Sequence, residues 1–234
     1  MNSRFMLGVR HGIPIFLGYL SVSFGFGIVA VQSGLSIFTA TAISATNLTS
    51  AGQAMGVQVM AAAGTIVEMI LTQLIINIRY SLMGISLSQK LHPSFSTLHR
   101  LVASYGITDE IFAVASSQTF AITPAYMYGL ILVSMLGWVT GTFLGASAGQ
   151  LLPTSVTDAM GILLYGMFLA IIIPPARREH RVLFVVAVAA ALSTIFHFLI
   201  PGVPGGFAMI ISALIAAAAG ALFFPLPDEK EATA

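Results

Sequence analysis

Charged residues are scarce in this chain of 234 residues: nine Lys and Arg and eight Asp and Glu make up only 7% of it. An average soluble domain has about 25% charged residues. So few charges cannot cover the surface of a soluble fold of this length, and 57% of the residues are hydrophobic. The sequence therefore predicts that lipid surrounds most of the protein surface.

Cysteine is absent, which excludes disulfides, thiolate metal sites and a cysteine nucleophile. The five histidines have no metal-ligand spacing, and the sequence has no Ser/His/Asp set, HExxH motif or phosphate-binding loop. A net charge of +1 gives no basic field for nucleic acid. We therefore expect a protein that is not an enzyme and that uses no metal or cofactor.

Charges and turn residues divide the sequence into apolar blocks of membrane-spanning length. The eight blocks are residues 11–31, 37–63, 64–87, 101–122, 124–148, 156–173, 182–200 and 205–224. The first block is too long for a secretion signal, so we interpret it as a retained helix. The ends, 1–9 and 225–234, are predicted to be solvated tails of a single transmembrane domain covering residues 1–234.

Basic residues predict the orientation, because loops rich in Lys and Arg stay in the cytoplasm. Three basic clusters stand out: Arg4 with Arg10, residues 90–100, and residues 177–181. If every block crossed the membrane once, the second cluster would lie outside. The conflict disappears if the second and fourth blocks each enter and leave the membrane on the same side.

The second and fourth blocks are also rich in polar residues, and each has a break, at residues 50–53 and 106–109. Irregular backbone at membrane depth is tolerated only where protein or water surrounds it, and two such breaks indicate a binding site near the midplane. We predict an all-α polytopic helix bundle with about six full spans, two broken or re-entrant segments and both termini in the cytoplasm. Residues 11–62 and 64–121 would form an inverted repeat. The alternative is seven or eight ordinary spans.

Ionisable side chains inside the blocks are candidate functional residues, since each costs roughly 2.5–3.5 kcal/mol at a helix centre unless it pairs or lines a cavity. In the third block, Glu68, Thr72 and Arg79 project to within about 40° of one another, and Gln73 and Asn77 lie roughly opposite. A helix with two polar faces is expected in the middle of the bundle. Arg79 either forms a structural ion pair or binds a substrate carboxylate.

Asp109 and Glu110 follow the second break. A carboxylate there either caps the half-helix that begins at the break or accepts a proton or an ammonium group. Glu68 is a third candidate for proton coupling. At the first break, Gly52 and Gln53 either start a half-helix whose free N–H groups bind a carboxylate or mark a kink in an ordinary helix.

Glycines recur every four residues in and just beyond the fifth block, at Gly137, Gly141, Gly145 and Gly149. This spacing places them on one helix face and predicts close packing against another helix. We interpret this stripe as structural.

Three segments make the sequence resemble the AzlC-type large subunit of branched-chain amino acid exporters, the LIV-E family. They are residues 12–25, which begin Gly-x-Pro, residues 44–53, which end Ala-Gly-Gln, and residues 77–82 combined with 107–113. The resemblance extends from about residue 12 to residue 224. It implies an inner-membrane exporter of Leu, Ile, Val and in some cases Met, which works with a small hydrophobic AzlD-like subunit.

We therefore predict a secondary transporter that binds a zwitterionic amino acid between the two breaks and works by alternating access. The predicted substrate-binding residues are Gly52, Gln53, Asn77, Arg79, Thr108, Asp109 and Glu110, of which the last two, with Glu68, are also candidates for proton coupling. Two alternatives remain open: a passive channel for small solutes, and a structural membrane subunit without a substrate path of its own.

Overall fold

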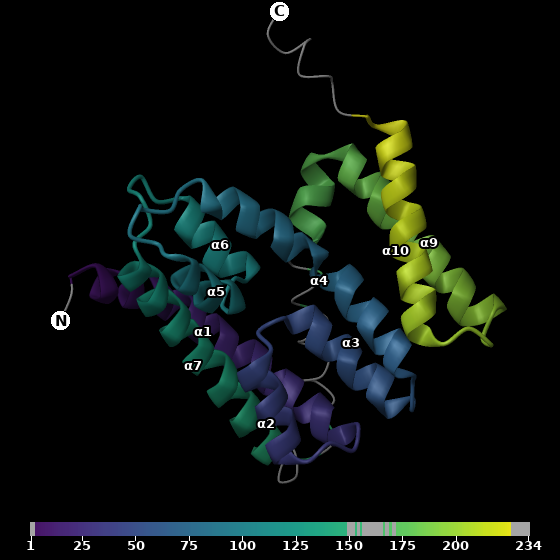
Figure 1. The fold of residues 1–234 in the computed structure, drawn as a ribbon. Coiled ribbons are helices and arrows are strands. Elements are labelled where there is room, and N and C mark those ends of the chain that lie inside the picture. Colours follow the sequence, from purple (N-terminus) through teal and green to yellow (C-terminus); the bar gives the residue numbers. More distant parts are fainter. Residues whose placement is uncertain are drawn as a thin grey trace, which may run out of the picture.

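The computed structural model describes residues 3–148 and 172–225, with Pro153, Ser155, Gly166 and Leu169 between them. The named elements of this part of the chain are all α-helices (Figure 1). They are α1 (Ser3–Gln32), α2 (Ile37–Thr46), α3 (Ser50–Ala61), α4 (Ile66–Ser88), α5 (Thr97–Tyr105), α6 (Asp109–Ser116), α7 (Pro124–Ala148), α9 (His180–Leu199) and α10 (Gly205–Phe223).

Five of these helices, α1, α4, α7, α9 and α10, are long and apolar enough to cross a membrane. They correspond to five of the six predicted full spans, so the prediction of an all-α polytopic protein is confirmed. The remaining expected span, 156–173, lies almost entirely outside the described residues. Gly149, the last glycine of the predicted stripe, also lies outside them.

The second block is broken, as predicted, into α2 of 10 residues and α3 of 12 residues. At about 1.5 Å per residue, neither helix alone crosses a hydrocarbon core of about 30 Å. The break lies three residues earlier than predicted, because the Thr49 side chain caps α3 by accepting a hydrogen bond from the Gly52 N–H, and Asn47 is extended (φ −148°, ψ 108°). Gly52 is therefore in the first turn of α3, so a half-helix does start here and the simple kink is wrong, while carboxylate binding by its N–H groups stays a prediction.

The fourth block is broken at the predicted place, into α5 of 9 residues and α6 of 8 residues. Gly106 ends α5, and the Thr108 side chain caps α6 by accepting a hydrogen bond from the Ile111 N–H at 3.3 Å. The capping interpretation of Asp109 is therefore wrong: Thr108, one residue earlier, already has the extended backbone that an N-cap requires.

Helices α1 and α7 pack closely along their lengths and run in the same direction (Figure 1). Gly137 lies against the backbone of Phe16, and Gly145 lies against the backbone of Phe24. Gly141, between them, lies against Leu20 and Ser23 of α1. Side chains at these positions would hold the two backbones apart, so the glycines permit the close approach.

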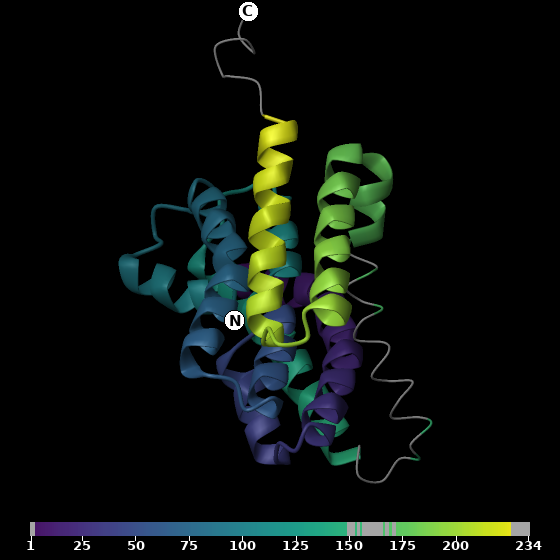
Figure 2. The ribbon, with the colours of Figure 1, turned by 90° about the vertical axis from the view of Figure 1, so that its right-hand side faces the viewer.

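The remaining long helices lie to one side of this pair. Helix α4 runs antiparallel to α3 and also contacts α6 and α10. Figure 2 shows α10 beside α9 (yellow and green), which are joined by a short loop. Two of the basic clusters are at one end of the molecule: Arg4 stacks over the Phe120 ring at 4.3 Å, and Lys90 donates a hydrogen bond to the Ser116 carbonyl.

We predict that Gly145→Ala destabilises the protein, because the new methyl group would overlap the Phe24 backbone and force α1 and α7 apart. Overpacking of this kind costs typically about 1–3 kcal/mol. Gly18→Ala is the matched control, since no atom lies within 4 Å of a methyl group at Gly18. Thermal unfolding in detergent should show a lower midpoint for Gly145→Ala alone, and equal midpoints would contradict the packing role.

Candidate functional site

The two helix breaks lie side by side in the structure. Tyr105, the last residue of α5, donates a hydrogen bond from its hydroxyl to the carbonyl of Ala45 in the last turn of α2. Arg79 of α4 forms an ion pair with Asp109, the first residue of α6, at 2.9 Å. Four helix ends therefore meet here: α2 and α5 end, and α3 and α6 begin.

A cavity of about 140 Å³, here called the central cavity, lies between the breaks. Its lining comes from the first break, from α4 and from the second break: Asn47, Leu48, Thr49, Asn77, Tyr80, Ser104, Tyr105 and Ile107. The lining is rich in amide and hydroxyl groups, which suits a small polar molecule.

A chain of hydrogen bonds on one side of the central cavity holds α3 against α4. Thr49 donates from Oγ1 to Asn77 Oδ1 at 2.7 Å, and Asn77 donates from Nδ2 to Gln73 Oε1 at 3.1 Å. Gln73 in turn donates to the Gly52 carbonyl at 2.8 Å. Asn77 and Gly52, both predicted from the sequence, are thus brought together, and Asn77 faces the cavity.

Arg79 and Asp109 form an ion pair, and neither is among the residues that line the central cavity. The side chains of Arg79 and Asp109 are 37% and 32% exposed, so about a third of each is left uncovered by the described residues. Arg79 also donates to the Tyr80 hydroxyl at 3.3 Å, while its Nε–H is buried without a hydrogen-bond partner among the described residues.

Gln53 points away from the central cavity. Its side chain is buried, accepts a hydrogen bond from Trp138 Nε1 at 2.8 Å and donates one to Ser44 Oγ at 2.8 Å. Ser44 in turn shares a hydrogen bond of 2.7 Å with Thr142. Gln53 therefore joins α3 to α2 and α7, and the structure does not bring it together with Asn77 or Arg79.

Thr108 and Glu110 are joined to α1 by Tyr19. The Tyr19 hydroxyl donates to Glu110 Oε2 at 2.5 Å and lies 2.6 Å from Thr108 Oγ1. Sequence reasoning did not select Tyr19 as a functional residue, because a tyrosine in an apolar helix is common and its partners lie about ninety positions away. Its place in the Gly-rich segment 12–25 was the only available signal.

Glu68 lies apart from the other predicted residues. It is 4% exposed, and its Oε1 accepts a hydrogen bond of 2.9 Å from the N–H of Gly206, in the first turn of α10. The positive end of a helix stabilises such a carboxylate. The nearby Thr72 Oγ1 is buried without a partner among the described residues. The role of Glu68 in proton coupling stays a prediction.

The helix ends give the central cavity a polarity. The starts of α3 and α6 are positive ends and the ends of α2 and α5 are negative ends of helix dipoles. Helix α6 carries Asp109 and Glu110 in its first turn, whereas α3 carries no acidic residue there. The start of α3 is therefore the part of the cavity wall best suited to a carboxylate.

Comparison with known proteins gives consistent matches. The family model described as "AzlC protein" matches residues 14–152. The chain is 27% identical over 207 residues to "Inner membrane protein YgaZ" of Escherichia coli (strain K12), covering 86% of this chain and 84% of that protein. It is 29% identical over 200 residues to an uncharacterized membrane protein of Archaeoglobus fulgidus, covering 85% and 87%. No solved structure matches.

We predict that Gln53→Leu lowers the stability of the protein, because Trp138 Nε1–H would lose its buried acceptor. A buried polar group left without a partner costs about 1–3 kcal/mol. Gln58→Leu is the matched control, since Gln58 is an exposed amide in the same helix. Thermal unfolding midpoints in detergent distinguish the two, and an unchanged midpoint for Gln53→Leu would show that this network contributes nothing.

Proposed function

This chain belongs to the AzlC family, and from this membership we propose that it is the large subunit of a two-subunit amino acid exporter. The proposed substrates are small neutral amino acids: leucine, isoleucine, valine and also methionine. The proposed partner is a small hydrophobic AzlD-like subunit. The relative from Escherichia coli is named as an inner membrane protein, and we propose the same membrane here.

The arrangement of helices supports re-entrant segments. Because Arg4 contacts Phe120 and Lys90 contacts Ser116, the start of α1 and the end of α4 lie at the same end of the molecule. If α1 and α4 each cross once, they cross in opposite directions, and the α2–α3 pair returns to the side it entered. Since α7 runs parallel to α1, the same holds for α5–α6.

This topology accounts for the charges and for an internal repeat. Basic residues at the start of α1 and in residues 90–100 lie together, which the positive-inside rule places in the cytoplasm with both termini. One span and one broken pair, α1 with α2–α3, are followed by the inverted unit, α4 with α5–α6. Inverted repeats with broken helices are typical of transporters that work by alternating access.

The meeting of the two breaks around the central cavity is the observation that carries the proposal. A zwitterionic amino acid offers a carboxylate to the positive start of α3 and an ammonium group to the carbonyl ends of α2 and α5. Thr49 and Asn77 lie between these ends and supply hydroxyl and amide groups. Arg79 binds the carboxylate only when its pair with Asp109 opens.

Transport can be tested in everted membrane vesicles that contain the chain and its small partner subunit. Leucine, isoleucine and valine added outside should accumulate against their concentration gradient with saturation. Comparison with and without a pH gradient tests proton coupling. A passive channel would equilibrate the amino acids without accumulation or saturation, and a purely structural subunit would leave uptake at the level of vesicles that lack both proteins.

The role of Arg79 can be separated from its structural contribution by a charge swap. Arg79→Asp alone places two carboxylates together and should reduce the amount of folded protein, because the ion pair that joins α4 to α6 is lost and the two like charges repel each other. Adding Asp109→Arg restores the pair and the protein level. If Arg79 binds substrate, leucine uptake per folded complex stays at least about tenfold below normal; full recovery of uptake would mean that the pair only joins α4 to α6.

A further inference from the structure

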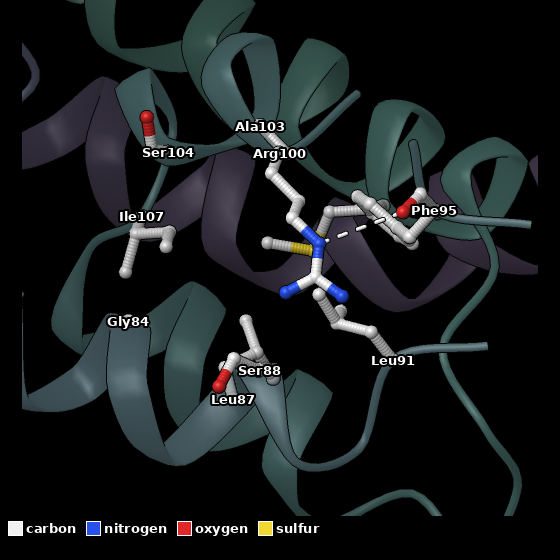
Figure 3. Close-up of a pocket in the computed structure, with 10 residues that line it drawn as sticks. Gly84, Leu87, Ser88, Leu91, Phe95, Arg100, Ala103, Ser104 and Ile107 are labelled. Carbon is white, nitrogen blue, oxygen red and sulfur yellow. Dashed lines mark hydrogen bonds between the residues drawn. The ribbon is translucent and has the colours of Figure 1, made fainter. Parts of the chain in front are cut away.

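A second cavity, here called the vestibule, lies between the end of α4 and the start of α5, and Figure 3 shows it. Its volume is about 170 Å³, far above the ~10–15 Å³ that one water molecule needs. Four buried apolar side chains form part of its wall: Leu87, Phe95, Ala103 and Met127. The vestibule is therefore large enough for a small organic molecule and is mainly apolar.

Arg100 of α5 provides the charge in the vestibule. Arg100 is exposed, and its Nε–H makes a long hydrogen bond of 3.5 Å to the Phe95 carbonyl. Figure 3 shows the two terminal nitrogens directed away from α5, toward Leu91 and Ser88. No hydrogen bond or ion pair engages these nitrogens within the part of the chain that the structure describes. No acidic side chain lines the vestibule among the same residues.

The vestibule adjoins the central cavity. Ser104 and Ile107 line both cavities, so they form the boundary between them. The outer end of the vestibule adjoins the segment that contains Lys90, at the basic end of the molecule. A molecule that passes from this end to the two helix breaks can therefore occupy the vestibule first.

We infer that the vestibule is a separate binding site for a branched apolar carboxylate on its way to the central cavity. The carboxylate binds the terminal nitrogens of Arg100, and the branched tail packs against Leu87, Phe95 and Met127. Because the vestibule offers one cation and no anion, an amino group adds nothing to binding there. The site therefore accepts the leucine skeleton with or without its amino group, and the central cavity selects for the zwitterion. This inference rests on the proposed function for the identity of its natural ligand and on geometry alone for the site.

Binding can be measured without transport, using 4-methylpentanoate, which has the leucine skeleton but no amino group. The chain and its partner subunit in nanodiscs of zwitterionic phosphatidylcholine should unfold at a higher temperature when 4-methylpentanoate is added, because ligand binding stabilises the folded state. The neutral 4-methylpentanamide should have no effect. Arg100→Gln should abolish the shift, whereas Arg10→Gln, which removes an exposed charge from α1 near the same end of the molecule, should preserve it.

Three results of this measurement would contradict the proposal that the vestibule binds a carboxylate. An equal shift with the amide would show that the charge is not recognised. A shift that persists in Arg100→Gln would place binding elsewhere. Loss of the shift when anionic lipid is added to the wild-type nanodiscs would show that Arg100 holds a lipid headgroup rather than a small carboxylate.

Transport kinetics provide a second, independent readout. In everted vesicles, Arg100→Gln should raise the KM for leucine at least about tenfold and keep the maximal rate within about twofold, because only binding before the central cavity is weakened. Gly84→Leu, which fills the vestibule from α4, should act in the same way. Gly18→Leu is its control, since space is also open at Gly18 but outside the vestibule.

The two proposals fail in different ways. If the wild-type complex transports no leucine but shows the Arg100-dependent thermal shift, the proposed binding site in the vestibule is supported and the proposal of amino acid export is wrong. If leucine is transported and Arg100→Gln leaves the KM for leucine unchanged, the proposal of export is supported and the proposed binding site in the vestibule is wrong.

Discussion

Backbone N–H and C=O groups find no hydrogen-bond partners in hydrocarbon, and this constraint governs the centre of the molecule. Two broken helices bring four helix ends to one place, and each end needs partners from the protein. Thr49 and Thr108 cap the helices that begin there, and the Tyr105 hydroxyl binds a carbonyl of the helix that ends there. The close packing of α1 on α7 supports this arrangement, because Tyr19 and Trp138 extend from these two helices to the breaks.

The sequence predicted both breaks because two kinds of signal coincided: polar residues in apolar blocks, and basic clusters that a simple crossing count would place on opposite sides. The first break lies three residues before its predicted position, because Thr49 caps α3 and the helix therefore begins at Ser50, before Gly52 is reached. The direction of Gln53 could not be predicted, since its partner Trp138 lies 85 positions away and only tertiary packing determines which face of a short helix meets it.

Helix α4 shows why a polar helix can still lie among lipid-facing elements. Its opposed polar faces meet different neighbours: Gln73 and Asn77 bind the first break, and Glu68 binds the start of α10. Large apolar side chains between these faces, such as Leu74 and Ile78, remain exposed in the described structure. Helix α4 contacts α3, α6 and α10, but only Glu68, Thr72 and Leu87 of its residues are buried in the described structure, so the expected position in the middle of the bundle is not confirmed.

Trp138 is the sole tryptophan of the chain. Its indole binds Gln53 of α3 and meets the Tyr19 ring edge-on, with ring centroids 5.1 Å apart. The half-helix α3, the Glu110–Tyr19 contact and the α1–α7 pair therefore all adjoin one fluorophore. Any rearrangement that moves the broken helices relative to α1 and α7 changes the polarity around this indole, so the intrinsic emission of Trp138 would report such a rearrangement without an attached dye.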